Sequence, residues 1–87
     1  MFITLTVGSY LIVHGYDEHN KEIVEEVTVQ SPAEKVVAVS RIQSISENYV
    51  LVTGSHGRLM YWEYTDGYAN LKRKLHLAGL MVDQNRT

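Results

Sequence analysis

The first residues whose side chains could bind a metal are two histidines and a carboxylate in one short stretch, His14, Asp17 and His19. Imidazole and carboxylate groups bind zinc, and two histidines with one carboxylate also suit a non-haem iron centre. The pattern places His14 at the end of a strand and His19 in a turn, so no rigid element preorganises them as ligands. We therefore expect two surface histidines beside a turn, and no metal site.

A second candidate is the segment Gly54-Ser-His-Gly57 before Arg58, which offers backbone amides and a guanidinium to an anion. It lacks the lysine and the following helix of a phosphate-binding P-loop, so turn chemistry accounts for its glycines. Ser55, His56 and Asp66 could supply a hydrolytic triad, but the chain has no G-x-S-x-G elbow and no cysteine. We expect no catalytic residues and no cofactor, so the sequence does not predict an enzyme.

Aromatic and basic side chains are interleaved in the C-terminal half of the chain. Their members are Arg58, Tyr61, Trp62, Tyr64, Lys72, Arg73 and Lys74. Such a set can stack single-stranded bases while holding phosphates. The net charge of −2 and the isoelectric point near 6.0 argue against nucleic acid as the first choice of partner. Nucleic-acid binding is therefore the alternative function, with Lys72, Arg73 and Lys74 as its possible contacts.

Most of these aromatics belong to one predicted β-hairpin. A strand over Tyr49 to Thr53, a glycine-bracketed turn and a strand over Arg58 to Tyr64 make the best-specified hairpin in the chain. Adjacent strand residues point to opposite faces, so Tyr61 and Trp62 cannot both face the core. Thr65 or Asp66 is then expected to cap a helix that extends to about Ala78 and stops at Gly79.

The N-terminal part of the chain also predicts strands. Phe2 to Tyr16 is rich in β-branched and aromatic residues, and Gly8-Ser9 within it is either a hairpin turn or a bulge in one long strand. A polar turn over Asp17 to Lys21 precedes a second strand, Glu22 to Val29, which should have one solvent-facing side.

The segment that follows is ambiguous. Ser31-Pro-Ala-Glu34 has the residue types of a helix capping box, with proline at the first helical position. The next residues are rich in valine and isoleucine, which favour a pleated sheet. We expect one turn of helix and then a strand to about Ser46, with a longer helix as the alternative.

Together these elements predict an α+β fold with a single domain over residues 1–87. Its antiparallel β-meander sheet of five or six strands should be partly curled and packed by one C-terminal α-helix, with a frayed tail at 83–87. The absence of cysteine and of long apolar runs favours a cytoplasmic location and argues against a membrane span. Charge is uneven, because residues 1–50 sum to −4 and residues 51–87 to +2.

Part of this order of elements resembles a known family. Between Ile42 and Leu75, the succession of strand, turn, Tyr49-Val-Leu-Val strand, glycine turn, strand and helix is similar to part of a LytTR-type DNA-binding domain. The resemblance lies in the hydrophobic pattern, so it assigns no role to any residue.

One narrow helix cannot cover the apolar side chains of so many strands, because a helix is about 10 Å across and five strands span about 24 Å. The apolar side chains that the helix leaves uncovered must contact another molecule, or the sheet must close into a barrel around them. We rank docking to another molecule first. The leading hypothesis is therefore a non-enzymatic protein–protein interaction module, a small regulatory or inhibitory protein of the kind that phages and mobile elements encode. Its partner would be another protein or a second copy in a homodimer. The predicted contacts on one side of the hairpin are Tyr49, Trp62 and Tyr64, rimmed by Arg58.

Overall fold

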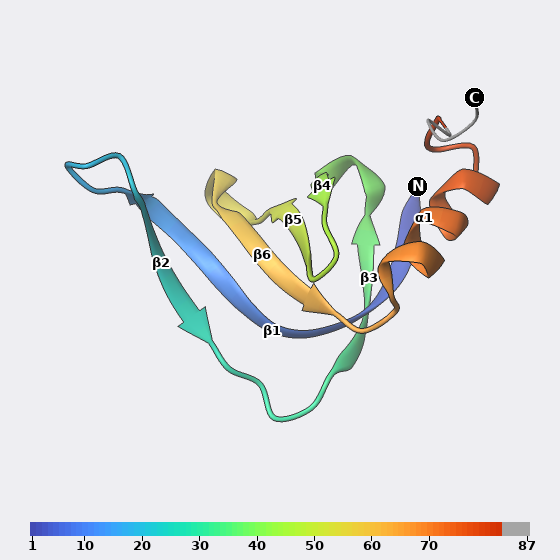
Figure 1. Cartoon of the computed structure of the whole chain (residues 1–87), viewed down its shortest axis with the longest axis horizontal. Helices are drawn as coiled ribbons and strands as arrows, with labels where there is room; N and C mark the ends of the chain where they lie inside the picture. Colours follow the sequence, from blue (N-terminus) through green and yellow to red (C-terminus); the bar gives the residue numbers. More distant parts are fainter. Residues whose placement is uncertain (83–87) are drawn as a thin grey trace.

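The computed structural model describes residues 1–82, so the tail expected at 83–87 lies outside the described residues. Six strands and one C-terminal helix follow one another along the chain (Figure 1). They are β1 (Phe2–Tyr16), β2 (Glu22–Val27), β3 (Ala33–Ala38), β4 (Ile42–Ile45), β5 (Tyr49–Thr53), β6 (Leu59–Tyr64) and α1 (Tyr68–Leu77). The α+β fold with one antiparallel sheet and one C-terminal helix is thereby confirmed.

The long strand β1 organises the sheet. The strand order is β2-β1-β6-β5-β4, all pairs are antiparallel, and β3 pairs with the N-terminal half of β1. Strands β2 and β3 thus share one edge of β1, while β6 occupies the other edge (Figure 1). The sheet curls but does not close into a barrel within the described residues.

Gly8 and Ser9 lie within one continuous strand and form a bulge in it. Of the two predicted alternatives, the bulge is therefore correct and the hairpin turn is wrong. The register between β1 and β6 shifts between Val7 and Tyr10, where β1 bends. The Ser9 hydroxyl oxygen accepts a hydrogen bond from the Val29 N–H at 3.1 Å. Before the bulge the odd-numbered residues Ile3 and Leu5 face the core, and after it the even-numbered Tyr10 does. The bulge therefore changes which alternate residues of β1 face inward.

The capping-box prediction is wrong. Residues 33–38 form strand β3, followed by a 3-10 turn at Val39–Arg41 and strand β4. Val36 and Val37 belong to β3, where pairing with Thr4 and Ile3 of β1 uses their β-branched shape. Tertiary pairing with β1 therefore overrides the local capping signature of Ser31-Pro-Ala-Glu34.

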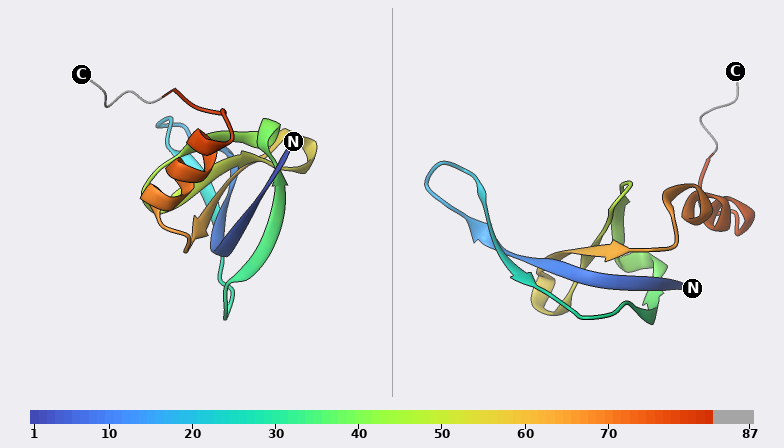
Figure 2. Two further views of the ribbon diagram at one scale, coloured as in Figure 1. Left: turned by 90° about the vertical axis from the view of Figure 1, so that its right-hand side faces the viewer. Right: turned by 60° about the horizontal axis from the view of Figure 1, so that its bottom comes forward.

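The core lies between the inner side of the curled sheet and α1. Its buried residues are Ile3, Leu5, Val37, Val50, Val52, Trp62, Tyr64, Leu71 and Leu75. Helix α1 contributes only Leu71 and Leu75, one turn apart on the same face. A single helix thus covers one end of one side of the sheet (Figure 2).

Both ends of α1 are fixed by backbone geometry. The prediction that Thr65 or Asp66 caps the helix is wrong. The cap position is Gly67, which has φ of 90° and no side chain, and the Asp66 carboxylate instead accepts a hydrogen bond from the Thr6 N–H at 2.9 Å. The expected stop at Gly79 is confirmed. Gly79 has φ of 74°, its N–H donates to the His76 carbonyl, and the Leu80 N–H donates to the Leu75 carbonyl. These two bonds make a Schellman motif.

The hairpin formed by the end of β1, the turn at 17–21 and β2 projects from the body (Figure 2). The radius of gyration is 14.1 Å, against about 12 Å expected for a compact chain of this length. Ile23 and Val24, on opposite sides of β2, are 47% and 45% exposed, so β2 has two solvent-facing sides rather than the single one expected. We call residues 14–27 the acidic arm, because they hold five carboxylates and one lysine.

Candidate protein-interaction surface

The two faces of the β5–β6 hairpin differ in what covers them. Trp62 and Tyr64 are 6% and 7% exposed and belong to the core, so they are not the exposed contacts that the sequence suggested. Val50 pairs with Trp62 on that inner side, whereas Tyr49 pairs with Glu63 on the other. Tyr49 therefore does not share a face with Trp62 and Tyr64, and the predicted grouping of these three aromatics is wrong.

The opposite side of the sheet is a second apolar surface. Directly paired residues share a face, and one such row runs from Leu11 of β1 through Tyr61 of β6 to Leu51 of β5. We call this surface the open face. It comprises Leu11, Val13, Tyr49, Leu51, Leu59 and Tyr61. None of these six belongs to the core cluster, although Val13 is only 7% exposed.

Tyr61 spans the open face. Its hydroxyl donates a hydrogen bond to the Glu22 carboxylate at 3.1 Å. Because β1 lies between β6 and β2, the Tyr61 side chain must cross β1 to reach Glu22. On its other side, the Tyr61 ring meets the Tyr49 ring edge to face, with centroids 6.0 Å apart. The two rings therefore form a fixed aromatic ridge across the sheet.

The rim of the open face is acidic. Glu26 pairs with Leu11, Glu63 pairs with Tyr49, and Glu22 holds the Tyr61 hydroxyl, so all three carboxylates lie on this side. All three side chains are exposed. An apolar centre with carboxylates around it disfavours phosphate and favours a partner with basic groups at its margin.

Burial and the Glu22 carboxylate raise the pKa of the Tyr61 phenol above 10.0. Burial is the larger cause, followed by the hydrogen bond to Glu22 and the repulsion between that carboxylate and a phenolate. Tyr61 consequently stays neutral over the physiological range and acts as a hydrogen-bond donor.

Arg58 lies at the turn end of the hairpin and not on the rim of the open face. It lines a shallow cavity of about 400 Å³ together with Ile12, Gly54, His56 and Met60. Ile12 and Met60 are paired on the inner side of the sheet, so this cavity opens away from the aromatic ridge. Arg58 is therefore separated from Tyr49 and Tyr61.

The three basic residues of α1 each contact a different group. The Lys74 ammonium donates to the Thr4 carbonyl at 3.0 Å, the Lys72 ammonium sits 4.8 Å from the centre of the Tyr68 ring, and Arg73 donates to the Asn70 side chain. All these partners are neutral. Within residues 1–82, no lysine or arginine lies within 4.0 Å of a carboxylate, so the positive charge of α1 is not compensated locally.

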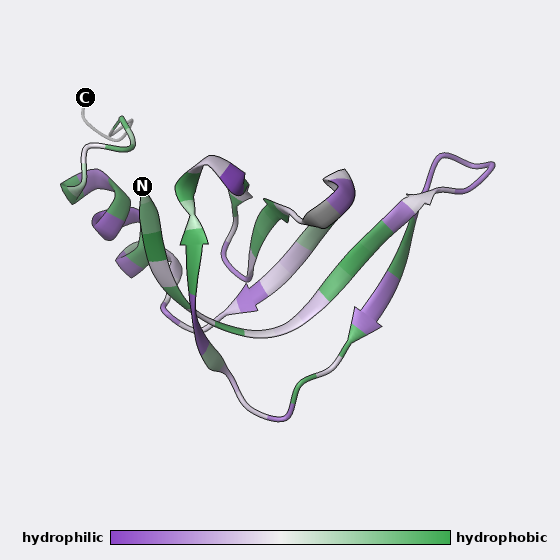
Figure 3. Cartoon of the chain, turned by 180° about the vertical axis from the view of Figure 1, so that it is seen from behind, coloured by the Kyte–Doolittle hydropathy of each residue, from purple (hydrophilic) through white to green (hydrophobic). Residues whose placement is uncertain are grey.

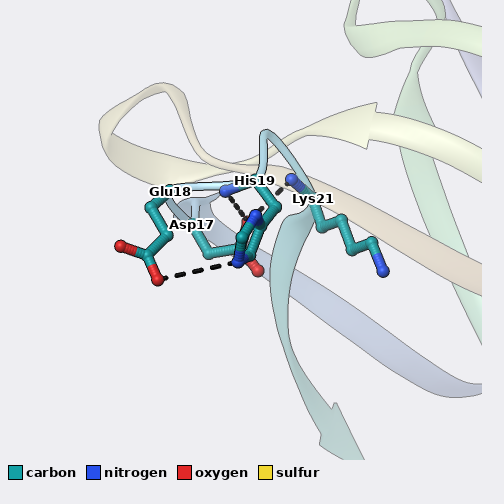
Figure 4. Close-up of polar contacts among 4 residues, drawn as sticks. All are labelled: Asp17, Glu18, His19 and Lys21. Carbon is teal, nitrogen blue, oxygen red and sulfur yellow. Dashed lines mark hydrogen bonds and ion pairs between the residues drawn. The ribbon is translucent and has the colours of Figure 1, made fainter.

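The His14, Asp17 and His19 side chains do not converge. The His14 imidazole lies 2.7 Å from the Glu25 carboxylate across the strand pair. The Asp17 carboxylate instead accepts hydrogen bonds from the backbone N–H groups of His19 and Lys21, while the His19 ring lies 3.6 Å from Glu18 (Figure 4). Among the described residues no three such groups are placed to hold a metal ion. Asp17 therefore shapes the turn.

Comparison of the chain with known protein families, with curated proteins and with solved structures found no match. In the described part of the chain, no helix has the length and apolar character needed to cross a membrane. The candidate surface therefore depends on geometry alone. Leu11 and Glu22 were not singled out from the sequence, because their proximity to Tyr61 depends on the pairing of β1 with β6.

Proposed function

We propose that this protein is a non-enzymatic protein-interaction module, a small regulatory or inhibitory protein that docks a partner protein on its open face. The observation that supports the proposal is the second apolar side of the sheet, whose residues lie outside the core cluster and, apart from Val13, are partly exposed. Contiguous apolar surface of this kind marks interaction sites in soluble domains. The ridge of Tyr49 and Tyr61 supplies the aromatic anchors on which binding energy usually concentrates.

The negative charge on the rim of the open face indicates which side chains the partner should present. Glu22, Glu26 and Glu63 would attract lysine or arginine side chains around an apolar centre. Two copies joined through their open faces would instead bring these acidic rims together, which disfavours a homodimer built on this surface. We therefore assign the open face to a different protein, with a basic margin.

Binding of nucleic acid is the second candidate, supported by the uncompensated Lys72, Arg73 and Lys74 on α1. The aromatics that were expected to assist stacking do not join them, because Trp62 is buried and Tyr61 is flanked by carboxylates. A titration of labelled single-stranded and duplex DNA at low salt measures this activity directly. Binding should be absent or weak, since three cations supply few phosphate contacts.

The docking proposal is tested by capture of proteins from a lysate of the cells that carry the gene. Leu51→Glu places a charge in the centre of the open face, and we expect it to abolish capture of the partner seen with the wild-type protein. Tyr61→Ala should weaken the same interaction about tenfold or more, as expected of an aromatic anchor. Photo-crosslinking from position 51 then identifies the partner and its contact.

Val36→Glu is the matched control, because Val36 is 61% exposed and lies on β3, where it pairs with Thr4 near the N-terminal end of β1, far along that strand from Leu11. It adds the same charge to an exposed apolar position of another strand. Capture retained by this variant and lost by Leu51→Glu supports docking on the open face. If Leu51→Glu is folded by circular dichroism and still captures every partner of the wild-type protein, the proposal fails.

A further inference from the structure

Charges of opposite sign are concentrated at opposite ends of the molecule. The acidic arm, residues 14–27, has five carboxylates and one lysine, a net charge of −4 with neutral histidines. Helix α1 has three cations, Lys72, Arg73 and Lys74, and no acidic residue. The arm and α1 lie at the two ends of the long axis, which measures 43 Å (Figure 1).

These charges have little chance to neutralise one another within one molecule. The Debye length is about 8 Å at physiological ionic strength, far less than the length of the molecule. The described lysines and arginines form no ion pair with a carboxylate, and the arm pairs its acids only with His14 and His19. Both ends therefore present free charge to a second molecule.

The arm also has apolar surface that its own chain leaves bare. Tyr16, Ile23 and Val24 are between 45% and 57% exposed. Beyond the last β6 pairing at Ile12 the arm is a two-stranded hairpin, an element that is only marginally stable alone in water. Figure 3 shows an apolar band followed by a polar band along β2. Contact with another molecule would bury these side chains and stabilise the arm.

We propose that two copies of the chain associate side by side with their long axes antiparallel, so that the acidic arm of each lies along α1 of the other. This arrangement sets −4 against +3 at both ends and closes on itself through a two-fold axis. The parallel arrangement places arm beside arm and helix beside helix, and like charges oppose it. Pairing of two β2 edges is opposed in the same way by Glu22, Glu25 and Glu26.

The dimensions of the molecule allow such a dimer. One long side of the molecule measures 43 by 22 Å, about 900 Å², whereas a standard interface buries about 800 Å² on each partner. A stable interface must therefore use most of that side, from the arm to α1. Glu22 and Glu26 of the arm also lie on the rim of the open face, so self-association is measured on the purified protein alone, without a partner for that face.

Reciprocal charge reversal tests the arrangement by light scattering at low salt. The arm variant replaces Glu18, Glu25 and Glu26 with lysine, and the helix variant is Lys72→Glu with Arg73→Glu. All five side chains are outside the core, and none of the three glutamates bonds to the backbone in the described structure. Lys74 is retained because it anchors α1 to Thr4.

We expect the wild-type protein to have the mass of a dimer at low salt and to dissociate at 500 mM salt, with a dissociation constant raised at least tenfold. Each variant alone should have the mass of a monomer, because its arm and helix now have the same sign. An equimolar mixture of the two variants should form a heterodimer, since each arm again meets a helix of opposite charge.

Three results would overturn the inference. One is a monomeric wild-type protein at low salt, and another is a mixture of variants, each folded by circular dichroism, that stays monomeric. The third is a wild-type mass that keeps rising with concentration beyond two copies, which indicates open head-to-tail chains instead of a closed dimer.

Discussion

The assignment of Trp62 to the core and Tyr61 to the open face predicts opposite consequences for two neighbouring substitutions. Trp62 is 6% exposed and packs in the core cluster with Val50 and Tyr10. A buried tryptophan removes about 200 Å² from water, worth about 5 kcal/mol at 25 cal/mol/Å². Measured aromatic-to-alanine truncations in cores cost about 3 to 5 kcal/mol. Trp62→Ala should therefore remove that much of a total stability of about 4 to 13 kcal/mol.

Urea unfolding followed by far-ultraviolet circular dichroism measures this loss, because Trp62 is the only tryptophan and its fluorescence disappears with the substitution. Tyr61→Ala should cost about 1 to 2 kcal/mol, since its side chain is only partly buried and one exposed hydrogen bond to Glu22 is lost. Trp62→Phe should recover much of the loss. If Trp62→Ala costs less than about 1 kcal/mol, or if Tyr61→Ala costs as much as Trp62→Ala, the faces have been assigned incorrectly.

Three further outcomes follow from single features. Burial, followed by nearby acidic and phenolic groups, raises the pKa of Tyr61 and of Tyr64 above 10.0. The contribution of these two neutral phenols to the free energy of unfolding is therefore complete below pH 10 and is lost as the pH rises through their raised pKa values. Unfolding measured at pH 7 and pH 10.5 should show this loss in the wild-type protein and a smaller one in Tyr61→Phe, and equal losses would contradict it. Gly67→Ala forces a side chain into φ of 90° and should cost about 1 to 2 kcal/mol in thermal unfolding, whereas Gly8→Ala, at a position without positive φ, should change stability by less than about 0.5 kcal/mol. Asp66→Ala leaves a partly buried N–H of β1 without its acceptor and should cost about 1 to 3 kcal/mol in urea, while Asp66→Asn keeps an acceptor oxygen and should recover most of it.

Local sequence patterns predicted the elements whose structure depends on local rules. The hairpin over residues 49–64, the polar turn before Lys21 and the helix stop at Gly79 all agree with the structure. In each, nearby residues decide the backbone geometry through glycine φ values or side-chain bonds to adjacent amides. The antiparallel sheet with one C-terminal helix was predictable for the same reason.

The errors arise where distant segments decide the outcome. The capping box at Ser31 is overridden because β3 pairs with β1. The grouping of Tyr49 with Trp62 failed because sequence parity cannot set the register between two strands, and the register pairs Tyr49 with Glu63. The aromatic ridge was not predictable either, since the bond from Tyr61 to Glu22 joins residues 39 positions apart.

The span of β1 across three partners has a consequence for biosynthesis. Tyr10 pairs with Trp62, so the ribosome must add more than 50 further residues before β6 can meet this edge. At about 5 to 20 residues per second, the nascent chain spends about 3 to 10 seconds with no partner strand on the edge of β1 that β6 later occupies. Chaperone binding or slow translation ahead of β6 would therefore change the yield of native protein more than the stability of the finished molecule suggests.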